Sequence, residues 1–180
     1  MLKSLLLSSL LLASTSVSAA PCPEYLNHAL KKLHSSETIN LCSAFAGKPL
    51  LIINTASHCG YTPQFKALEQ LHQRYRDRGL VVLGFASDDF KQEAEDEQAI
   101  AEVCYRNFGV TFPMFAPIAV TGDAAHPLFK ALAAQTQEPA WNFNKYLLNA
   151  EGKVVQYFPS NVTPESAEMQ STLNKLLPAR

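Results

Sequence analysis

The sequence of 180 residues lacks an excess of either charge, a long apolar run and a dense set of cysteines. Its 15 Lys and Arg residues balance 16 Asp and Glu residues, for a formal net charge of −1. This balance argues against a nucleic-acid coat or an electrostatic membrane binder. No apolar run reaches the roughly 20 residues of a transmembrane helix. Because four cysteines are also too few for a disulfide scaffold, the composition excludes a collagen, a coiled coil and a multi-span membrane protein.

The first 19 residues have the pattern of a secretory signal peptide. Lys3 supplies a positive charge, a short apolar run over 5–12 follows, and small residues lead to an expected cleavage after Ala19. The run is too short for a membrane anchor, so we expect none on the mature chain. We therefore predict a signal peptide over 1–19 and a single domain over 20–180. We also predict export, with the bacterial periplasm as the compartment.

Export changes the interpretation of two cysteines. Disulfides form and persist outside the cytosol, and Cys22 and Cys42 lie 20 residues apart near the start of the mature chain. A bridge between them would hold the N-terminal segment and contribute about 3 kcal/mol through loop closure. Two unrelated thiols are the alternative, because four cysteines allow three pairings.

The rest of the chain alternates between strand-like and helix-like segments. Continuous apolar runs over 49–54 and 80–86 predict strands buried on both faces, with a third short strand over 112–117 and a hairpin over 145–158. The charged stretch 91–97 is predicted to be a solvated loop. Helices are expected over 27–33, 63–78, 100–108, 126–134 and 164–177. This order predicts one α/β domain with a mixed central sheet flanked by helices.

Cys59 is the candidate nucleophile. It follows the first predicted strand, lies in a polar turn and precedes the helix that begins near Pro63. The positive end of a helix dipole and its unpaired amides favour the reactive thiolate, which makes this arrangement typical of a thioredoxin-like fold. The next cysteine, Cys104, is 45 residues away, so a Cys-x-x-Cys oxidoreductase is not indicated. Ile52 and Ala56 stand where a peroxiredoxin motif needs Pro and Thr or Ser.

Four blocks resemble the glutathione peroxidase family, in its order and approximate spacing. Residues 54–62 look like the family's Asn-Val-Ala-Ser-x-Cys-Gly-x-Thr signature, and 84–90 are similar to its Gly-Phe-Pro-Cys-Asn-Gln-Phe segment. Residues 112–115 match Phe-Pro-x-Phe, and 141–147 match Trp-Asn-Phe-x-Lys-Phe-Leu. The resemblance implies a thioredoxin-like fold and a peroxidase acting on hydrogen peroxide or organic hydroperoxides.

The resemblance also implies roles for five residues. Cys59 takes the peroxidatic position, and Trp141 and Asn142 take partner positions whose N–H groups can donate to the thiolate. Asp89 stands where the family has Gln. Its carboxylate would disfavour a nearby thiolate unless it is protonated or points away. Cys104 matches the resolving cysteine of the thioredoxin-dependent branch. The alternatives are a structural Trp141 and a core Cys104.

The predicted cycle has three steps. Cys59 attacks the peroxide and becomes a sulfenic acid, Cys104 condenses with it to a disulfide, and a thioredoxin-like or other dithiol reduces the bridge. We expect no cofactor, metal or nucleic acid, and the short segment between 115 and 141 favours a monomer. Two other functions suit the same fold: a periplasmic thiol–disulfide exchanger, whose Cys-x-x-Cys motif is missing, and a redox sensor.

Overall fold

The computed structural model describes residues 22–179, so the predicted signal peptide over 1–19 lies outside the described residues. The elements are, in chain order, η1 (Glu24–Leu26), β1 (Ala29–Lys31), β2 (Thr38–Asn40), α1 (Leu41–Phe45), β3 (Leu50–Thr55), α2 (Gln64–Tyr75), η2 (Arg76–Arg78), β4 (Val81–Ala86), α3 (Glu97–Ala101), the π-helical segment η3 (Glu102–Asn107), β5 (Met114–Phe115), α4 (Pro127–Gln135), β6 (Lys145–Leu148), β7 (Val154–Phe158) and α5 (Ala167–Leu176).

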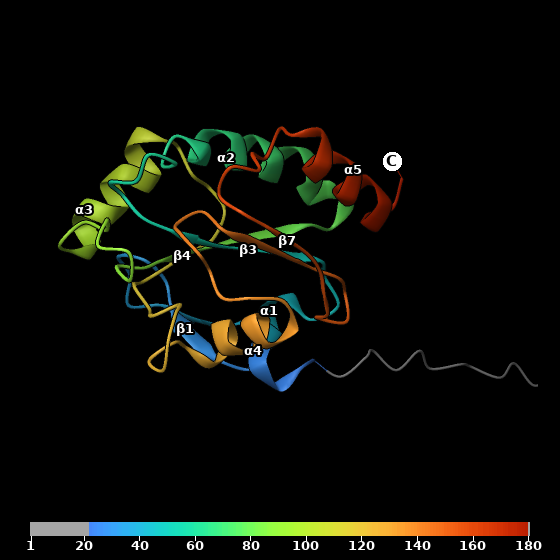
Figure 1. Cartoon of the computed structure of the whole chain (residues 1–180), viewed down its shortest axis with the longest axis horizontal. Coiled ribbons are helices and arrows are strands. Elements are labelled where there is room, and N and C mark those ends of the chain that lie inside the picture. The colour runs from blue at the N-terminus through green and yellow to red at the C-terminus, as the bar shows by residue number, and fades with distance from the viewer. Residues whose placement is uncertain (1–21, 180) are drawn as a thin grey trace, which may run out of the picture.

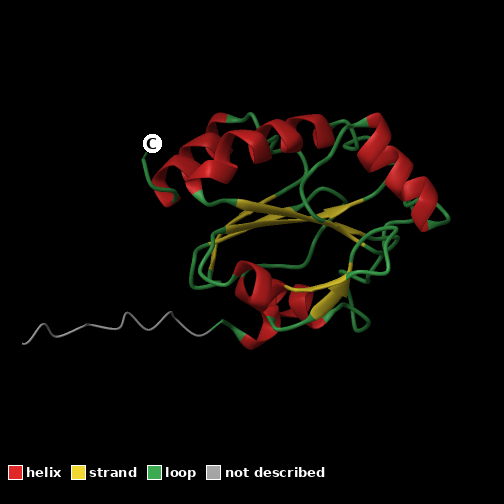
Figure 2. Cartoon of the chain, turned by 180° about the vertical axis from the view of Figure 1, so that it is seen from behind, coloured by secondary structure: helices red, strands yellow, loops and turns green. Residues whose placement is uncertain are grey.

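A five-stranded sheet lies between two layers (Figures 1 and 2). Helices α2, α3 and α5 cover one face, and α1, α4 and the β1–β2 hairpin cover the other. The strand order is β5-β4-β3-β6-β7. Strands β3, β4 and β5 run parallel, whereas β6 and β7 are antiparallel to their neighbours. The predicted α/β class with a mixed, helix-flanked sheet is confirmed.

Strand β3 explains why the sheet has a core on both faces. All six of its residues are buried: the apolar run 50–53, as its sequence predicts, and the polar Asn54 and Thr55 that follow it. Leu51 and Ile53 pack in the cluster that also contains α2 and α5 side chains, whereas Leu50 and Ile52 pack in the cluster that contains α4 side chains. Successive strand residues point to opposite faces, so one strand supplies both clusters.

Two predicted elements differ from the structure. The helix expected over 27–33 is instead strand β1, in which Leu30 is buried between two exposed residues. The Leu spacing in this segment fits a helix, but the alternation of exposed and buried residues is that of a strand. The helix expected over 100–108 begins at Glu97, where Asp96 caps it by accepting from the amide of Ala99 at 2.8 Å, and it continues as η3.

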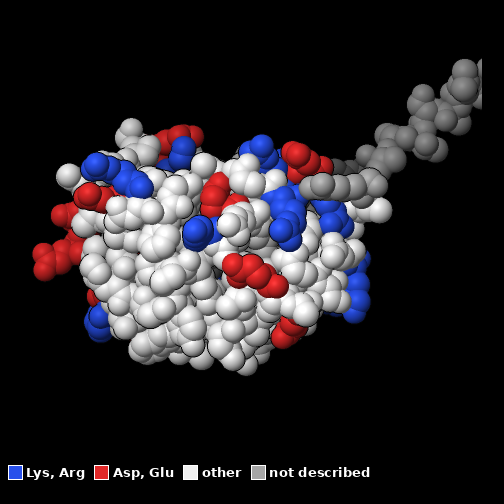
Figure 3. All heavy atoms as spheres, turned by 90° about the horizontal axis from the view of Figure 1, so that it is seen from above, with Lys and Arg blue, Asp and Glu red and all other residues white. Residues whose placement is uncertain are grey.

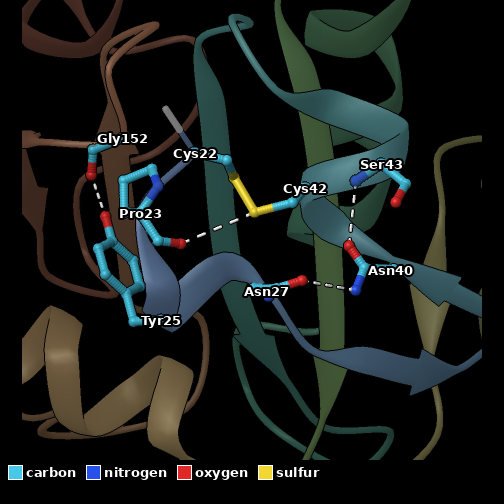
Figure 4. The surroundings of a disulfide bond; sticks show 8 residues. All are labelled: Cys22, Pro23, Tyr25, Asn27, Asn40, Cys42, Ser43 and Gly152. Atoms are coloured by element: carbon cyan, nitrogen blue, oxygen red, sulfur yellow. Dashed lines mark hydrogen bonds between the residues drawn. A yellow bond between two sulfur atoms is a disulfide. The ribbon is translucent and has the colours of Figure 1, made fainter. Parts of the chain in front are cut away.

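The predicted bridge between Cys22 and Cys42 is present, with the two Cα atoms 5.8 Å apart (Figure 4). It ties the segment before η1 to α1. The Tyr25 hydroxyl donates to the carbonyl of Gly152 in the β6–β7 turn. Asn40 accepts from Ser43 N at 3.0 Å and thereby caps α1. The bridge and these contacts fix the N-terminal segment against the α1–α4 side of the sheet.

The surface carries mixed charge. Figure 3 looks down on the layer of α2, α3 and α5, where basic and acidic side chains are interspersed and much of the face is uncharged. Within residues 22–179, no helix has both the length and the apolar character that crossing a bilayer requires.

Candidate active site

Cys59 lies in the turn that leads from β3 to α2. Its Sγ accepts a hydrogen bond from Tyr61 N at 3.4 Å, and its own amide donates to Thr62 Oγ1 at 3.1 Å. That hydroxyl in turn donates to the carbonyl of Ala56 at 2.9 Å. The residue is only 6% exposed. The turn therefore holds the sulfur at the end of a buried strand, with the backbone amide of Tyr61 directed at it.

The Trp141–Asn142 pair lies in the turn before β6, and Asn54 at the end of β3 holds this turn. Asn54 Nδ2 donates to Trp141 O at 3.0 Å, and Asn54 O accepts from Phe143 N at 2.7 Å. Phe143 has a φ of 63°, a left-handed conformation that is uncommon for a residue other than glycine. Because β3 also leads into the Cys59 turn, one strand end positions both segments.

Trp141 forms one wall of a surface cavity beside the Cys59 turn. Its side chain is 42% exposed, and its ring lies 5.2 Å from that of Phe90, centroid to centroid. The cavity has a volume of about 360 Å³ and is lined by Tyr61, Ala140, Trp141, Asn144, Pro159, Ser160 and Asn161. None of these lining side chains is charged. The cavity therefore suits neutral or apolar ligands.

Gln92 connects the Cys59 turn to Asn142. Its backbone carbonyl accepts from His58 N at 2.9 Å, and its side-chain Oε1 accepts from Asn142 Nδ2 at 3.1 Å. Gln92 thus contacts both the residue before Cys59 and the carboxamide of Asn142. Gln92 is not among the predicted site residues, because the charged stretch 91–97 predicts a solvated loop. A carboxamide three residues after Asp89 was the available signal.

Asp89, which the sequence predicts at the site, makes its side-chain hydrogen bonds outside this network. Its Oδ2 accepts from Val120 N at 2.6 Å, from Thr121 N at 2.9 Å and from Thr121 Oγ1 at 3.2 Å. All three donors belong to Val120 and Thr121, which lie in the loop before α4. The carboxamide that accepts the hydrogen bond from Asn142 Nδ2 belongs to Gln92.

Glu93, next to Gln92, is a second residue that sequence reasoning missed. Its Oε1 accepts from Ser57 N at 2.8 Å, from Ala94 N at 2.9 Å and from the Ser57 hydroxyl. Its Oε2 is buried and has no hydrogen-bond partner among the described residues. Burial raises the pKa of the Glu93 carboxyl, although the bonds from Ser57 and Ala94 act in the opposite direction.

Cys104 lies in the π-helical segment η3 and is 1% exposed. Burial, together with the nearby Glu93 charge, raises the pKa of its thiol to about 12. Cys59 and Cys104 are both free thiols and belong to the same buried cluster, on the α2–α5 side of the sheet. Single π-helical turns occur frequently at functional sites. In this reduced form Cys104 is a neutral, buried thiol.

The described residues contain no group of three or more His, Cys, Asp or Glu side chains placed to hold a metal ion. The polar and reactive groups described above are the thiols of Cys59 and Cys104, the carboxamides of Gln92 and Asn142, and the carboxylate of Glu93. Known proteins of similar sequence identify the family to which the chain belongs. The family model described as "Glutathione peroxidase" matches residues 26–133.

The chain belongs to the glutathione peroxidase family.

Individual relatives of the family agree with this assignment. "Glutathione peroxidase-like peroxiredoxin GPX5" of Chlamydomonas reinhardtii is 48% identical over 136 residues, which cover 71% of this chain and 84% of the relative. "Hydroperoxy fatty acid reductase gpx1" of Synechocystis sp. is 42% identical over 145 residues, or 74% and 85% of the two chains. As a glutathione peroxidase family member, the protein is a peroxidase.

A solved structure shows a similar fold. "Crystal structure of Trgpx in apo form" superposes with a TM-score of 0.66 at 30% identity, covering 84% of this chain and 94% of that one. The fold of this glutathione peroxidase family member is thus thioredoxin-like, as the sequence predicts.

Proposed function

We propose that this protein is an exported two-cysteine thiol peroxidase in which Cys59 reduces the peroxide and Cys104 resolves the product. The observation that carries the proposal is the geometry around Cys59. Its sulfur meets the amide of Tyr61, and the adjacent backbone binds Gln92, which in turn holds Asn142. A second free thiol, Cys104, belongs to the same buried cluster.

The first step is attack by the Cys59 thiolate on one peroxide oxygen. The O–O bond breaks, Cys59 becomes a sulfenic acid, and the other oxygen leaves and takes up a proton to give water or an alcohol. Charge develops on that leaving oxygen. The N–H groups of Trp141, Asn142 and Gln92 are the side-chain donors at this end of β3 that can stabilise it.

The lining of the cavity beside Trp141 bears on which peroxides the protein reduces and on which reductant it uses. Its uncharged lining suits organic hydroperoxides as well as hydrogen peroxide. The Synechocystis relative is named for reduction of hydroperoxy fatty acids. The lining offers no Lys or Arg to bind the carboxylates of glutathione. A protein dithiol that reduces a Cys59–Cys104 bridge by thiol–disulfide exchange is therefore the proposed electron donor.

Two observations support export and, within this proposal, a periplasmic location. The N-terminal sequence has the pattern of a signal peptide, and the described domain contains a disulfide between Cys22 and Cys42. Structural disulfides persist in oxidising compartments. A dithiol donor would have to operate in the same compartment.

The test is a stopped-flow reaction of the protein, with Cys59 and Cys104 reduced, against one equivalent of hydrogen peroxide. Trp141 is the sole tryptophan, so its fluorescence reports on the site. We expect a fast change and, by peptide mass spectrometry of the quenched product, a bridge between Cys59 and Cys104. A reaction at the rate of an ordinary thiol would contradict the proposal and favour a thiol–disulfide exchanger or a redox sensor.

The Cys104→Ser variant separates the two chemical steps. It should still reduce one equivalent of peroxide, because Cys59 is unchanged, but it should not turn over with a dithiol reductant. The Cys22→Ser/Cys42→Ser double variant is the matched control, since it removes the other pair of sulfurs and should turn over normally. Full turnover by Cys104→Ser would rule out the resolving role.

A further inference from the structure

Asn144 lies at the centre of a buried hydrogen-bond network next to the Trp141–Asn142 pair. The residue is only 1% exposed. Its Oδ1 accepts from the amide of Ala140 at 2.6 Å and from the amide of Trp141 at 3.2 Å. The same oxygen accepts from the hydroxyl of Tyr157, on β7, at 2.5 Å. One side-chain oxygen therefore ties β7 to the backbone that carries the indole.

Ser160, which follows β7, holds the same turn from the other side. Its hydroxyl donates to the carbonyl of Asn142 at 2.6 Å and accepts from Asn144 Nδ2 at 2.8 Å. Its carbonyl accepts from the side chain of Gln64 at 2.6 Å. Gln64 is the first residue of α2, the helix that follows the turn carrying Cys59. Ser160 thereby connects the turn before β6 to that helix.

The turn needs such anchors because its backbone is not in a preferred conformation. Phe143 has a φ of 63°, which a residue with a β-carbon keeps only where the surrounding contacts hold it. Asn54 binds the carbonyl of Trp141 and the amide of Phe143, which leaves the amide of Trp141 and the carbonyl of Asn142 to other partners. Asn144 and Ser160 are those partners.

The side chain of Asn142 does not fix its own direction. Its Nδ2 donates to Gln92, but its Oδ1 is buried and has no hydrogen-bond partner among the described residues. The Trp141 ring contacts Phe90 on one side and is 42% exposed. The directions of the carboxamide and of the indole therefore depend on the backbone that carries them.

We propose that Asn144 and Ser160 are positioning residues for the peroxide step, an inference that rests on the proposed function. They hold the turn so that the N–H groups of Trp141 and Asn142 lie where charge develops on the leaving oxygen. Donors fixed in advance lower the barrier because they need no rearrangement during the reaction. A displacement of about 1 Å is enough to lose much of this effect. Asn144 and Ser160 act through the turn, and neither is assigned a contact with the peroxide.

A direct role in substrate binding does not fit Asn144, although it lines the cavity beside Trp141. Its Oδ1 already accepts from three donors, and its Nδ2 donates to Ser160. An oxygen with three donors offers no free acceptor site to a ligand. In the Trp-Asn-Phe-x-Lys pattern Asn144 occupies the position x, so the motif itself assigns it no role.

The variant Asn144→Ala removes the acceptor for the amides of Ala140 and Trp141. The rate constant of Cys59 oxidation by hydrogen peroxide should fall by at least about tenfold. Alkylation of Cys59 by iodoacetamide, at a pH where this thiol is fully ionised, should stay within about threefold of the parent, because that reaction has no leaving oxygen to stabilise. An equal loss in both reactions would mean that the Cys59 turn itself has been disturbed, and would overturn the proposal.

Tyr157→Phe is the matched control, because it removes one donor to Asn144 Oδ1 and leaves both amide bonds in place. Both of its rate constants should stay within about twofold of the parent. Ser160→Ala is the second variant, a smaller change that frees the carbonyl of Asn142, and its peroxide rate constant should fall by at least about fivefold. It decides the question alone if urea unfolding shows that Asn144→Ala is not folded. A peroxide rate constant within about twofold of the parent in the folded variant would overturn the positioning role.

The fluorescence of Trp141, the sole tryptophan, gives a readout that needs no peroxide. Time-resolved anisotropy measures the fast local motion of the indole. This motion should increase in Asn144→Ala and stay as in the parent in Tyr157→Phe. Unchanged motion in Asn144→Ala would overturn the positioning role alone. A parent protein that reacts with peroxide at the rate of an ordinary thiol would instead overturn the proposed function on which the inference rests.

Discussion

Gln92 and Asp89 lie three residues apart in one loop, but their side chains accept hydrogen bonds from different parts of the molecule. The Gln92 carboxamide meets Asn142, while the Asp89 carboxylate is used by the amides of Val120 and Thr121. We expect Gln92→Ala to lower the rate constant of Cys59 oxidation by at least about tenfold, because a preorganised polar group is lost next to the developing charge.

The matched variant Asp89→Asn should leave this rate constant within about twofold of the parent, because the Asp89 carboxylate accepts its hydrogen bonds from the loop before α4 and not from Asn142. Stopped-flow fluorescence with hydrogen peroxide measures both variants. A loss in Asp89→Asn as large as that in Gln92→Ala would place Asp89 at the site after all.

Lys145 is a buried cation on β6 whose protonation depends on pH. Its Nζ donates to Phe143 O at 2.8 Å and to Val162 O at 3.0 Å, and burial lowers its pKa to about 7. An unfolded lysine has a pKa of about 10.4. Between these two values the unfolded chain binds more protons than the folded one, so the free energy of unfolding should rise with pH, by at most about 1.4 kcal/mol per pH unit.

Urea unfolding at about pH 6, 7.5 and 9 measures this slope. The variant Lys145→Met should lose the contribution, so the difference between the two proteins isolates Lys145 from other titrating groups. The variant should also be less stable at high pH, because the carbonyls of Phe143 and Val162 lose their donor. Identical slopes for both proteins would show that Lys145 keeps an ordinary pKa in the fold.

At the scale of elements, η3 is the segment that we expect to rearrange when Cys104 forms the proposed bridge with Cys59. The helix before it is fixed at its start, because Glu97 binds Lys31 Nζ at 2.5 Å and His34 N at 2.8 Å. The π-helical conformation that follows is rare and occurs mostly as single turns within α-helices, frequently at functional sites. Opening is therefore expected in 102–109 and not in α3.

Hydrogen exchange before and after one equivalent of peroxide tests this expectation. Amides of η3 should lose protection on oxidation, whereas those of α2 and of the first turn of α3 should keep theirs. Oxidised Cys104→Ser is the control, since it cannot form the bridge and should show no such change. A uniform loss of protection across the molecule would speak against a local rearrangement.

The elements also show what a sequence can and cannot reveal. Strands β3 and β4 are predictable because burial on both faces demands continuous apolar residues. Strand β1 is not, because the spacing of Leu26, Leu30 and Leu33 satisfies a helical pattern as well. Nor could the burial of Glu93 be predicted from the sequence, because a charged stretch indicates solvent exposure. Glu93 is buried through its tertiary contact with Ser57, which the local sequence does not reveal.

At the scale of the whole molecule, the Cys22–Cys42 bridge closes a loop of 20 residues at the N-terminus. We expect the double variant Cys22→Ser/Cys42→Ser to lose about 3 kcal/mol of stability, because the unfolded chain gains the entropy that the bridge removes. Urea unfolding of the two proteins measures the difference. The rate of Cys59 oxidation should not change, since the bridge packs on the opposite face of the sheet, and a parallel fall in that rate would indicate a functional link between the faces.

The sheet lies between the two pairs of cysteines, and this position affects which cysteines can exchange disulfide partners. Cys22 and Cys42 pack on the α4 side, and Cys59 and Cys104 on the α2 side. Thiol–disulfide exchange requires a sulfur to attack another sulfur directly. The five-stranded sheet therefore keeps the two pairs apart, so that in the proposed cycle one pair can stay oxidised while the other is oxidised and reduced, and every turnover would begin from the same pairing.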